Sequence, residues 1–186
     1  MNVRRRSGFT LVELSIVIVV MGILATIITA IYGGYQKQYR DNIRKSNLTT
    51  LASAFKSYAT WQGSFVEAGS GCGYGGNGDG WLDATTSDAS SYSANSIAKC
   101  LVNAGYLKTV AEVTDPSGCN LNSGGACGSG NPTKAYMKAT CTVGGVKTVY
   151  LMAYLESQPA NNATIDALCG KGWGTTYGMN YYVQVQ

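Results

Sequence analysis

The most apolar part of the chain is a run of small and hydrophobic residues from 9 to 32, in which Glu13 is the one charged residue. As a helix rising ~1.5 Å per residue, this run is about 36 Å long, enough to cross a hydrocarbon core of ~30 Å. A secretory signal has a shorter apolar region, usually of ~7–15 residues, followed by a small-x-small cleavage site. The run therefore predicts a membrane-spanning helix, and a plain single-pass anchor fits its hydropathy equally well.

From residue 35 the pattern becomes amphipathic. No proline interrupts residues 9–62, so the helix is predicted to continue as a half-buried stretch. Between the two parts, Gly33-Gly34 predicts a kink or a locally melted turn, because each glycine costs a helix ~1 kcal/mol. The predicted apolar face comprises Tyr39, Ile43, Leu48, Leu51, Ala52, Phe55, Tyr58 and Ala59. The predicted solvent face carries Lys37, Arg40, Asp41, Arg44, Lys45 and Lys56.

The remainder of the chain predicts a mixed head. Residues 63–93 are rich in turn residues and predict a long surface loop held by Cys72. Residues 93–107 fit a short helix, and Asp115-Pro116 ends the segment that follows it. Strands are predicted at 135–143, 146–155 and 178–185, with Gly144-Gly145 as the turn between the first two. A hairpin and a terminal strand packed on the amphipathic helix give an α+β fold with an antiparallel sheet.

Composition narrows the class of protein. Of 186 residues, 45% are hydrophobic and 13% charged, which excludes a disordered chain and leaves room for one small domain. There is no histidine, so Ser-His-Asp and Cys-His catalysis and His-ligated metals are excluded, and we expect no enzyme. No run of Lys or Arg occurs beyond residue 45, so nucleic acid is not an indicated partner.

The charged residues and the cysteines predict the same orientation of the chain across the membrane. Arg4, Arg5 and Arg6 precede the apolar run and no comparable basic cluster follows it, so the positive-inside rule places the N-terminus in the cytoplasm and the head outside. Six cysteines without a C-x-x-C pair favour three disulfides, which persist outside the reducing cytosol. Six cysteines allow fifteen disulfide connectivities, and the sequence does not choose among them. A bond between Cys119 and Cys127 would close a short loop. The cysteines are Cys72, Cys100, Cys119, Cys127, Cys141 and Cys169.

The segment Arg4-Arg5-Arg6-Ser7-Gly8-Phe9-Thr10-Leu11-Val12-Glu13-Leu14 resembles the type III signal sequence of type IV pilins and pseudopilins. The resemblance implies that a prepilin peptidase cuts between Gly8 and Phe9 and methylates the new amine of Phe9. It also implies assembly with identical subunits by an inner-membrane platform and a cytoplasmic ATPase. A later segment, Leu101 to Leu107 followed by Asp115-Pro116, is similar to one in pseudopilins and some pilins. The predicted parts are a leader at 1–8, a membrane and assembly helix at 9–34, and an extracytoplasmic head at 35–186.

Glu13 is the predicted assembly residue. A carboxylate in hydrocarbon costs on the order of 2.5–3.5 kcal/mol, less near the interface, so a compensating partner is expected. After cleavage, the amine of Phe9 on a neighbouring subunit can pair with Glu13 and set the axial register. The alternative is a carboxylate that is hydrated at the bilayer edge.

Two ligand motifs in the glycine-rich segment carry less weight. Residues 73–78 match G-x-G-x-x-G, but no predicted strand precedes them, so a dinucleotide site is not expected. The segment from Asn77 has oxygen ligands at calcium-like spacing but lacks the first Asp and the closing Glu of an EF-hand. No cofactor is expected, and calcium is kept as a weak alternative with Asp79, Asp83 and Asp88 as candidate ligands.

The sequence thus predicts a structural subunit of a type IV pilus-like filament, anchored in the inner membrane before assembly and displayed at the cell surface afterwards. One alternative is a pseudopilin of a type II secretion system. The other is a minor subunit at a pilus tip that acts as an adhesin or binds DNA. Three cysteine pairs and a glycine-rich surface favour the exposed pilus.

Overall fold

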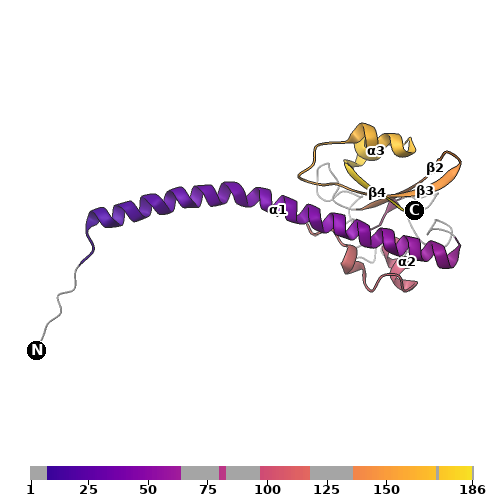
Figure 1. Ribbon diagram of the computed structural model, residues 1–186, viewed down its shortest axis with the longest axis horizontal. Helices are drawn as coiled ribbons and strands as arrows, with labels where there is room; N and C mark the ends of the chain where they lie inside the picture. Colours follow the sequence, from indigo (N-terminus) through magenta and orange to yellow (C-terminus); the bar gives the residue numbers. More distant parts are fainter. Residues whose placement is uncertain (1–7, 64–79, 83–96, 118–135, 171, 186) are drawn as a thin grey trace, which may run out of the picture. The chain divides into compact units, whose positions relative to one another are not determined.

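The computed structural model describes residues 8–63, 80–82, 97–117, 136–170 and 172–185 (Figure 1). By contacts the chain forms two compact units, Met1–Gln38 and Tyr39–Gln186. The helix α1, Leu11–Gln62, contributes to both units. The fold is α+β, as predicted, with a long N-terminal apolar helix and a small antiparallel sheet in a pilin-like layout.

In the first unit, the chain is helical from Leu11 onward, including Gly33 and Gly34. The predicted melted turn at these glycines is therefore wrong, and the kink stays a prediction. The hydroxyl groups of the apolar stretch donate back to the helix itself: Ser15 Oγ to the Val12 carbonyl at 2.8 Å and Thr26 Oγ1 to the Ile23 carbonyl at 2.7 Å. Such bonds satisfy hydroxyl groups where lipid offers no acceptor.

The sheet has the order β1-β2-β3-β4, with antiparallel pairs throughout. Its main strands match the three predicted ones. The turn of the β2–β3 hairpin is formed by Gly144 and Gly145, whose φ values of 59° and 83° favour glycine. The strands are β1 Gly80–Trp81, β2 Met137–Val143, β3 Val146–Ala153 and β4 Tyr181–Val185. β1 lies within residues 63–93, so the prediction of a loop is wrong at Gly80–Trp81, and residues 64–79 and 83–96 lie outside the described residues.

The sheet is covered on both faces by apolar side chains. On one face, Leu151 of β3 belongs to a cluster with Leu48 and Phe55 of α1. On the other face, Met152 belongs to a second cluster with Ile165. Alternate residues of β3 therefore serve two cores, which explains why the strand is buried from Thr148 to Ala153. Within the second unit, α1 and α3 lie on opposite sides of the sheet (Figure 1).

The second covering layer consists of α3, Asn162–Cys169, and α4, Trp173–Tyr177. Neither helix was predicted from the sequence, because eight and five residues are too few to show a helical period. Each helix ends at a glycine in the left-handed region, Gly170 at φ 62° and Gly178 at φ 71°.

On the α1 side, α2, Ile97–Asn103, and the 3-10 helix η1, Val110–Val113, complete the first core. The predicted helix over 93–107 is thus present in part. It ends before Gly105, whose φ of 81° reverses the chain so that Leu107 is buried.

Candidate functional site

The N-terminal motif enters α1 through a capping box. Thr10 precedes the first helical residue, and Glu13 Oε2 accepts the backbone N–H of Thr10 at 2.8 Å and its hydroxyl at 2.7 Å. In return, Thr10 Oγ1 accepts the backbone N–H of Glu13 at 3.2 Å. The Ser/Thr-x-x-Glu spacing is a known sequence signal for this cap. This cap was not predicted, because Glu13 was interpreted either as a partner for another subunit or as a hydrated carboxylate.

The residues that follow the cap are uncovered in the single chain. The large apolar side chains from Phe9 to Ile31 are exposed, from 42% at Val17 to 86% at Phe9. By length and composition, this part of α1 can cross a membrane. Gly8 lies before the helix, and a Cβ atom added there would meet nothing within 4 Å. The Gly8–Phe9 bond and the apolar helix behind it are therefore both accessible.

The second unit contains a buried set of charges, here called the Arg44 cluster. Its members are Arg40, Asp41, Arg44, Asp115 and Glu156. The Arg44 side chain is 0% exposed, and its Nε lies 2.7 Å from Asp115 Oδ2. Its second nitrogen, Nη1, lies 2.9 Å from both Asp41 Oδ1 and Glu156 Oε1. One guanidinium group thus joins α1 to two distant loops.

Further hydrogen bonds satisfy the carboxylates of the Arg44 cluster. Arg40 binds both oxygens of Glu156, through Nε at 2.8 Å and Nη2 at 2.6 Å. Asp41 accepts the backbone N–H groups of Glu156 and Ser157, each at 2.8 Å. These partners compensate the desolvation of buried charges, which is otherwise costly.

The hydrogen bonds favour the charged form of Asp41, Arg44 and Glu156. The guanidinium groups of Arg40 and then Arg44 lower the pKa of Glu156 to about 2 against the opposing effect of burial. Burial by itself raises the pKa of Asp41, but hydrogen bonds from Ser157 and Glu156 outweigh it and leave that pKa lowered. Burial lowers the pKa of Arg44, and the bonds and charge of Asp115 overcome this and raise it. Asp41, Arg44 and Glu156 are therefore charged at neutral pH.

The Arg44 cluster corrects the predicted solvent face of α1. Arg44 and Asp41 are buried, whereas Tyr39 of the predicted apolar face is 68% exposed. Burial follows a helical stripe that begins with polar residues and only then becomes apolar at Leu48. The partners that make this possible, Asp115 and Glu156, are far away in sequence, so a helical pattern alone does not contain them.

From the known cost of protonating a paired carboxylate we expect acid to weaken the head. Because the folded pKa of Glu156 is below its ordinary value of 4.5, its contribution is complete above about pH 5 and is lost as pH falls toward 2. The full shift corresponds to a loss on the order of 3 kcal/mol, of which about 2 kcal/mol has occurred by pH 3. Near-UV circular dichroism during thermal unfolding at pH 6, 4 and 3 measures it. In Glu156→Gln this part of the acid dependence should be absent; an equal acid dependence in both proteins would contradict the assignment.

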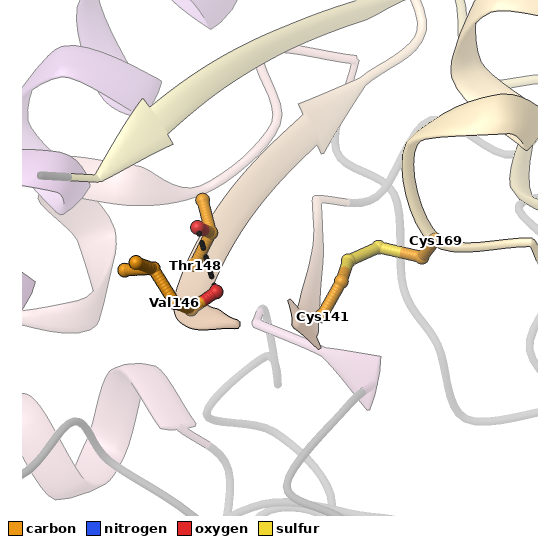
Figure 2. The surroundings of a disulfide bond; sticks show 4 residues. All are labelled: Cys141, Val146, Thr148 and Cys169. Carbon is orange, nitrogen blue, oxygen red and sulfur yellow. Dashed lines mark hydrogen bonds between the residues drawn. A yellow bond between two sulfur atoms is a disulfide. The ribbon is translucent and has the colours of Figure 1, made fainter. Parts of the chain in front are cut away.

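A disulfide holds the second covering layer to the sheet. Cys141 of β2 is bonded to Cys169, the last residue of α3, with 5.3 Å between their Cα atoms (Figure 2). Cys100 is also disulfide-bonded, and no described cysteine is free. Cys72, Cys119 and Cys127 lie outside the described residues. With one pair assigned, the other four cysteines have three possible connectivities instead of fifteen overall.

We expect that Cys141→Ser leaves the thiol of Cys169 as the one new site of alkylation in non-reduced protein. Loss of the bond frees the α3 end from β2, and removing a native disulfide costs ~2–5 kcal/mol of stability. Peptide mapping after alkylation locates the thiol. Labelling at a different cysteine, with Cys169 protected, would show that the pairing is wrong.

The weak ligand motifs have no described structure. Asp79, Asp83, Asp88 and residues 73–78 lie outside the described residues. Within the described part of the chain, no group of three or more His, Cys, Asp or Glu side chains is placed to hold a metal ion. Calcium binding at the three aspartates therefore stays a prediction.

Taken together, the accessible Gly8–Phe9 bond, the exposed apolar helix and the disulfide-bonded α+β head have the layout of a pilin-like, membrane-anchored subunit. The family model described as the prokaryotic N-terminal methylation motif matches residues 3–29. The chain therefore carries the signal motif of type IV prepilins, as predicted. No curated protein and no solved structure matches the chain.

Proposed function

We propose that the protein is a structural subunit of a type IV pilus-like filament, cut at Gly8–Phe9 by a prepilin peptidase and assembled through α1. The observation that carries this proposal is the uncovered apolar surface between Phe9 and Ile31, most of which lies within the matched methylation motif at residues 3–29. Such a surface needs lipid before assembly. Afterwards the same helices of neighbouring subunits can replace the lipid.

The geometry of Glu13 suits this transition. Both bonds from Thr10 go to Oε2, and within the described residues no hydrogen bond reaches Oε1. The carboxylate can therefore cap its own helix with one oxygen and accept a neighbour's Phe9 amine with the other. The amine exists only after cleavage, so processing would create the partner that assembly requires.

The proposal favours a surface filament over a pseudopilin. Disulfides in the head suit a structure that meets shear and proteases outside the cell. Electron microscopy with an antibody to the head, together with analysis of sheared material, tests this. The subunit should be found in long surface filaments; its retention in the cell envelope, with none in the sheared fraction, would contradict the proposal.

Processing gives a separate prediction. Gly8→Ala should be cut nearly as well as wild type, whereas Gly8→Leu should accumulate with its leader attached, because the peptidase must accommodate the residue before the cut. The subunit itself imposes no limit, since a Cβ atom at Gly8 meets nothing within 4 Å. N-terminal mass analysis is the measurement, with Phe9 expected as the first residue. A mature chain that starts at Met1, or near residue 30, would refute cleavage at this bond.

A further inference from the structure

The head contains a small pocket on the side of the sheet that α3 and α4 cover. Its volume is about 320 Å³, and its lining includes Tyr154, Gln158, Ala160, Asn162 and Thr175. These residues come from the loop that directly follows β3, the start of α3 and the first turn of α4. None of the described residues that line it is charged.

One wall of the pocket is held in place by a buried amide. Asn180 Nδ2 donates to the Leu155 carbonyl at 2.9 Å and, at longer range, to the carbonyls of Gln158 and Pro159 at 3.3 and 3.4 Å. Its Oδ1 accepts the backbone N–H of Leu155 at 2.7 Å. The loop that carries Gln158 is therefore formed before any ligand arrives.

The opposite wall is fixed by a carboxylate. Asp166 of α3 accepts the backbone N–H of Gly174 at 2.5 Å and also binds the backbone N–H and hydroxyl of Thr175. A Cβ atom at Gly174 would lie 2.6 Å from the Cα atom of Asn162, so glycine allows the two helices to touch at the pocket. Because the Thr175 hydroxyl donates to Asp166, its oxygen lone pairs are left to accept from a ligand.

The lining has the chemistry of a site for a neutral, hydroxyl-rich molecule. Two amides, a phenol and a threonine oxygen offer donors and acceptors, and the Tyr154 ring offers an apolar surface. Phosphate and carboxylate ligands usually require Arg or Lys, which the described lining lacks. The volume is at the lower end of the ~300–1,000 Å³ range of ligand pockets, which suits one ring. We propose that this pocket binds a single neutral sugar residue of a glycan.

The position of the pocket suits recognition from outside. In the second unit α1 covers one face of the sheet, and the pocket-bearing layer of α3 and α4 covers the other. This step rests on the function proposed above: if α1 lies in a filament core, the layer of α3 and α4 faces outward in every subunit. Repeated weak sites along one filament gain avidity without any new contact. Binding by a single subunit does not depend on that assembly.

The test uses the full chain in polyoxyethylene micelles, which contain no sugar. Saturation-transfer NMR with methyl glycosides of glucose, galactose, mannose, N-acetylglucosamine and N-acetylgalactosamine should detect binding of at least one of them. Ala160→Trp fills the pocket and should abolish the signal, and Gln158→Ala should raise the Kd about five- to ten-fold through loss of a hydrogen bond. The matched controls are Ala167→Trp and Asn42→Ala, which alter exposed residues outside the lining and should bind as wild type.

Absence of binding for all five glycosides, or binding that Ala160→Trp leaves unchanged, would overturn the proposal. Filament yield is measured on the same variants to separate the two proposals. Normal filaments with lost sugar binding in Ala160→Trp would support the site. Sugar binding by micellar subunits from a chain that never forms filaments would support the site and refute the proposed assembly.

Discussion

Glu13→Gln is expected to leave the subunit in the membrane at the wild-type level while the yield of sheared filaments collapses. Glutamine is the usual substitute for glutamate in a capping box, so the bonds with Thr10 are retained. What the variant loses is the negative charge, which we expect to pair with the Phe9 amine of a neighbouring subunit. Removing a carboxylate from an apolar segment also lowers the cost of insertion, on the order of 2.5–3.5 kcal/mol at the centre of a membrane.

Two companion variants separate charge from capping. Thr10→Val keeps the charge and removes the hydroxyl of the cap, so its filaments should persist with only a frayed first turn, worth ~1 kcal/mol. Glu13→Ala removes both and should behave like Glu13→Gln. Quantitative immunoblots of membrane and sheared fractions, with cleavage at Gly8 checked in each variant, give the comparison. Wild-type filament yield from Glu13→Gln would refute the pairing.

Arg44→Ala should strongly destabilise the head. It would leave the buried carboxylates of Asp41 and Asp115 without their guanidinium partner, and such unpaired buried charges cost about 3–5 kcal/mol. Arg40→Ala should cost less, because Arg40 is 27% exposed and Glu156 keeps Arg44 as a partner. Denaturant unfolding of the full chain in micelles, followed by near-UV circular dichroism, measures both.

A matched control for these variants is Lys56→Ala, which changes an exposed cation on the same helix. It should alter the free energy of unfolding by less than ~0.5 kcal/mol. A double variant, Arg44→Met with Asp115→Leu, removes opposite charges together and should recover part of the loss. Equal, small effects of Arg44→Ala and Lys56→Ala would show that the cluster does not hold α1 to the loops.

Features that depend on neighbouring residues in the chain were predictable from sequence. The run from 9 to 32 consists of small and hydrophobic residues with Glu13 as its one charged residue, so helix and membrane affinity follow from local composition. The β2–β3 hairpin follows from β-rich segments on either side of Gly144-Gly145. The methylation motif is likewise contiguous, which is why residues 3–29 suffice to identify it.

Features that depend on distant partners were decided by the tertiary structure. From its place in the helical pattern, Arg44 was predicted to face solvent. Its ion-pair partners Asp115 and Glu156, which compensate the desolvation cost of its burial, come from separate loops. The pairing of Cys141 with Cys169 was one of several choices until α3 was placed against β2. The local pattern of residues therefore determined which segments are helical, extended or able to enter a membrane. The burial of charge, the disulfide pairing and the pocket beside α4 depend on contacts between distant segments, and these contacts stabilise the protein only in the folded structure.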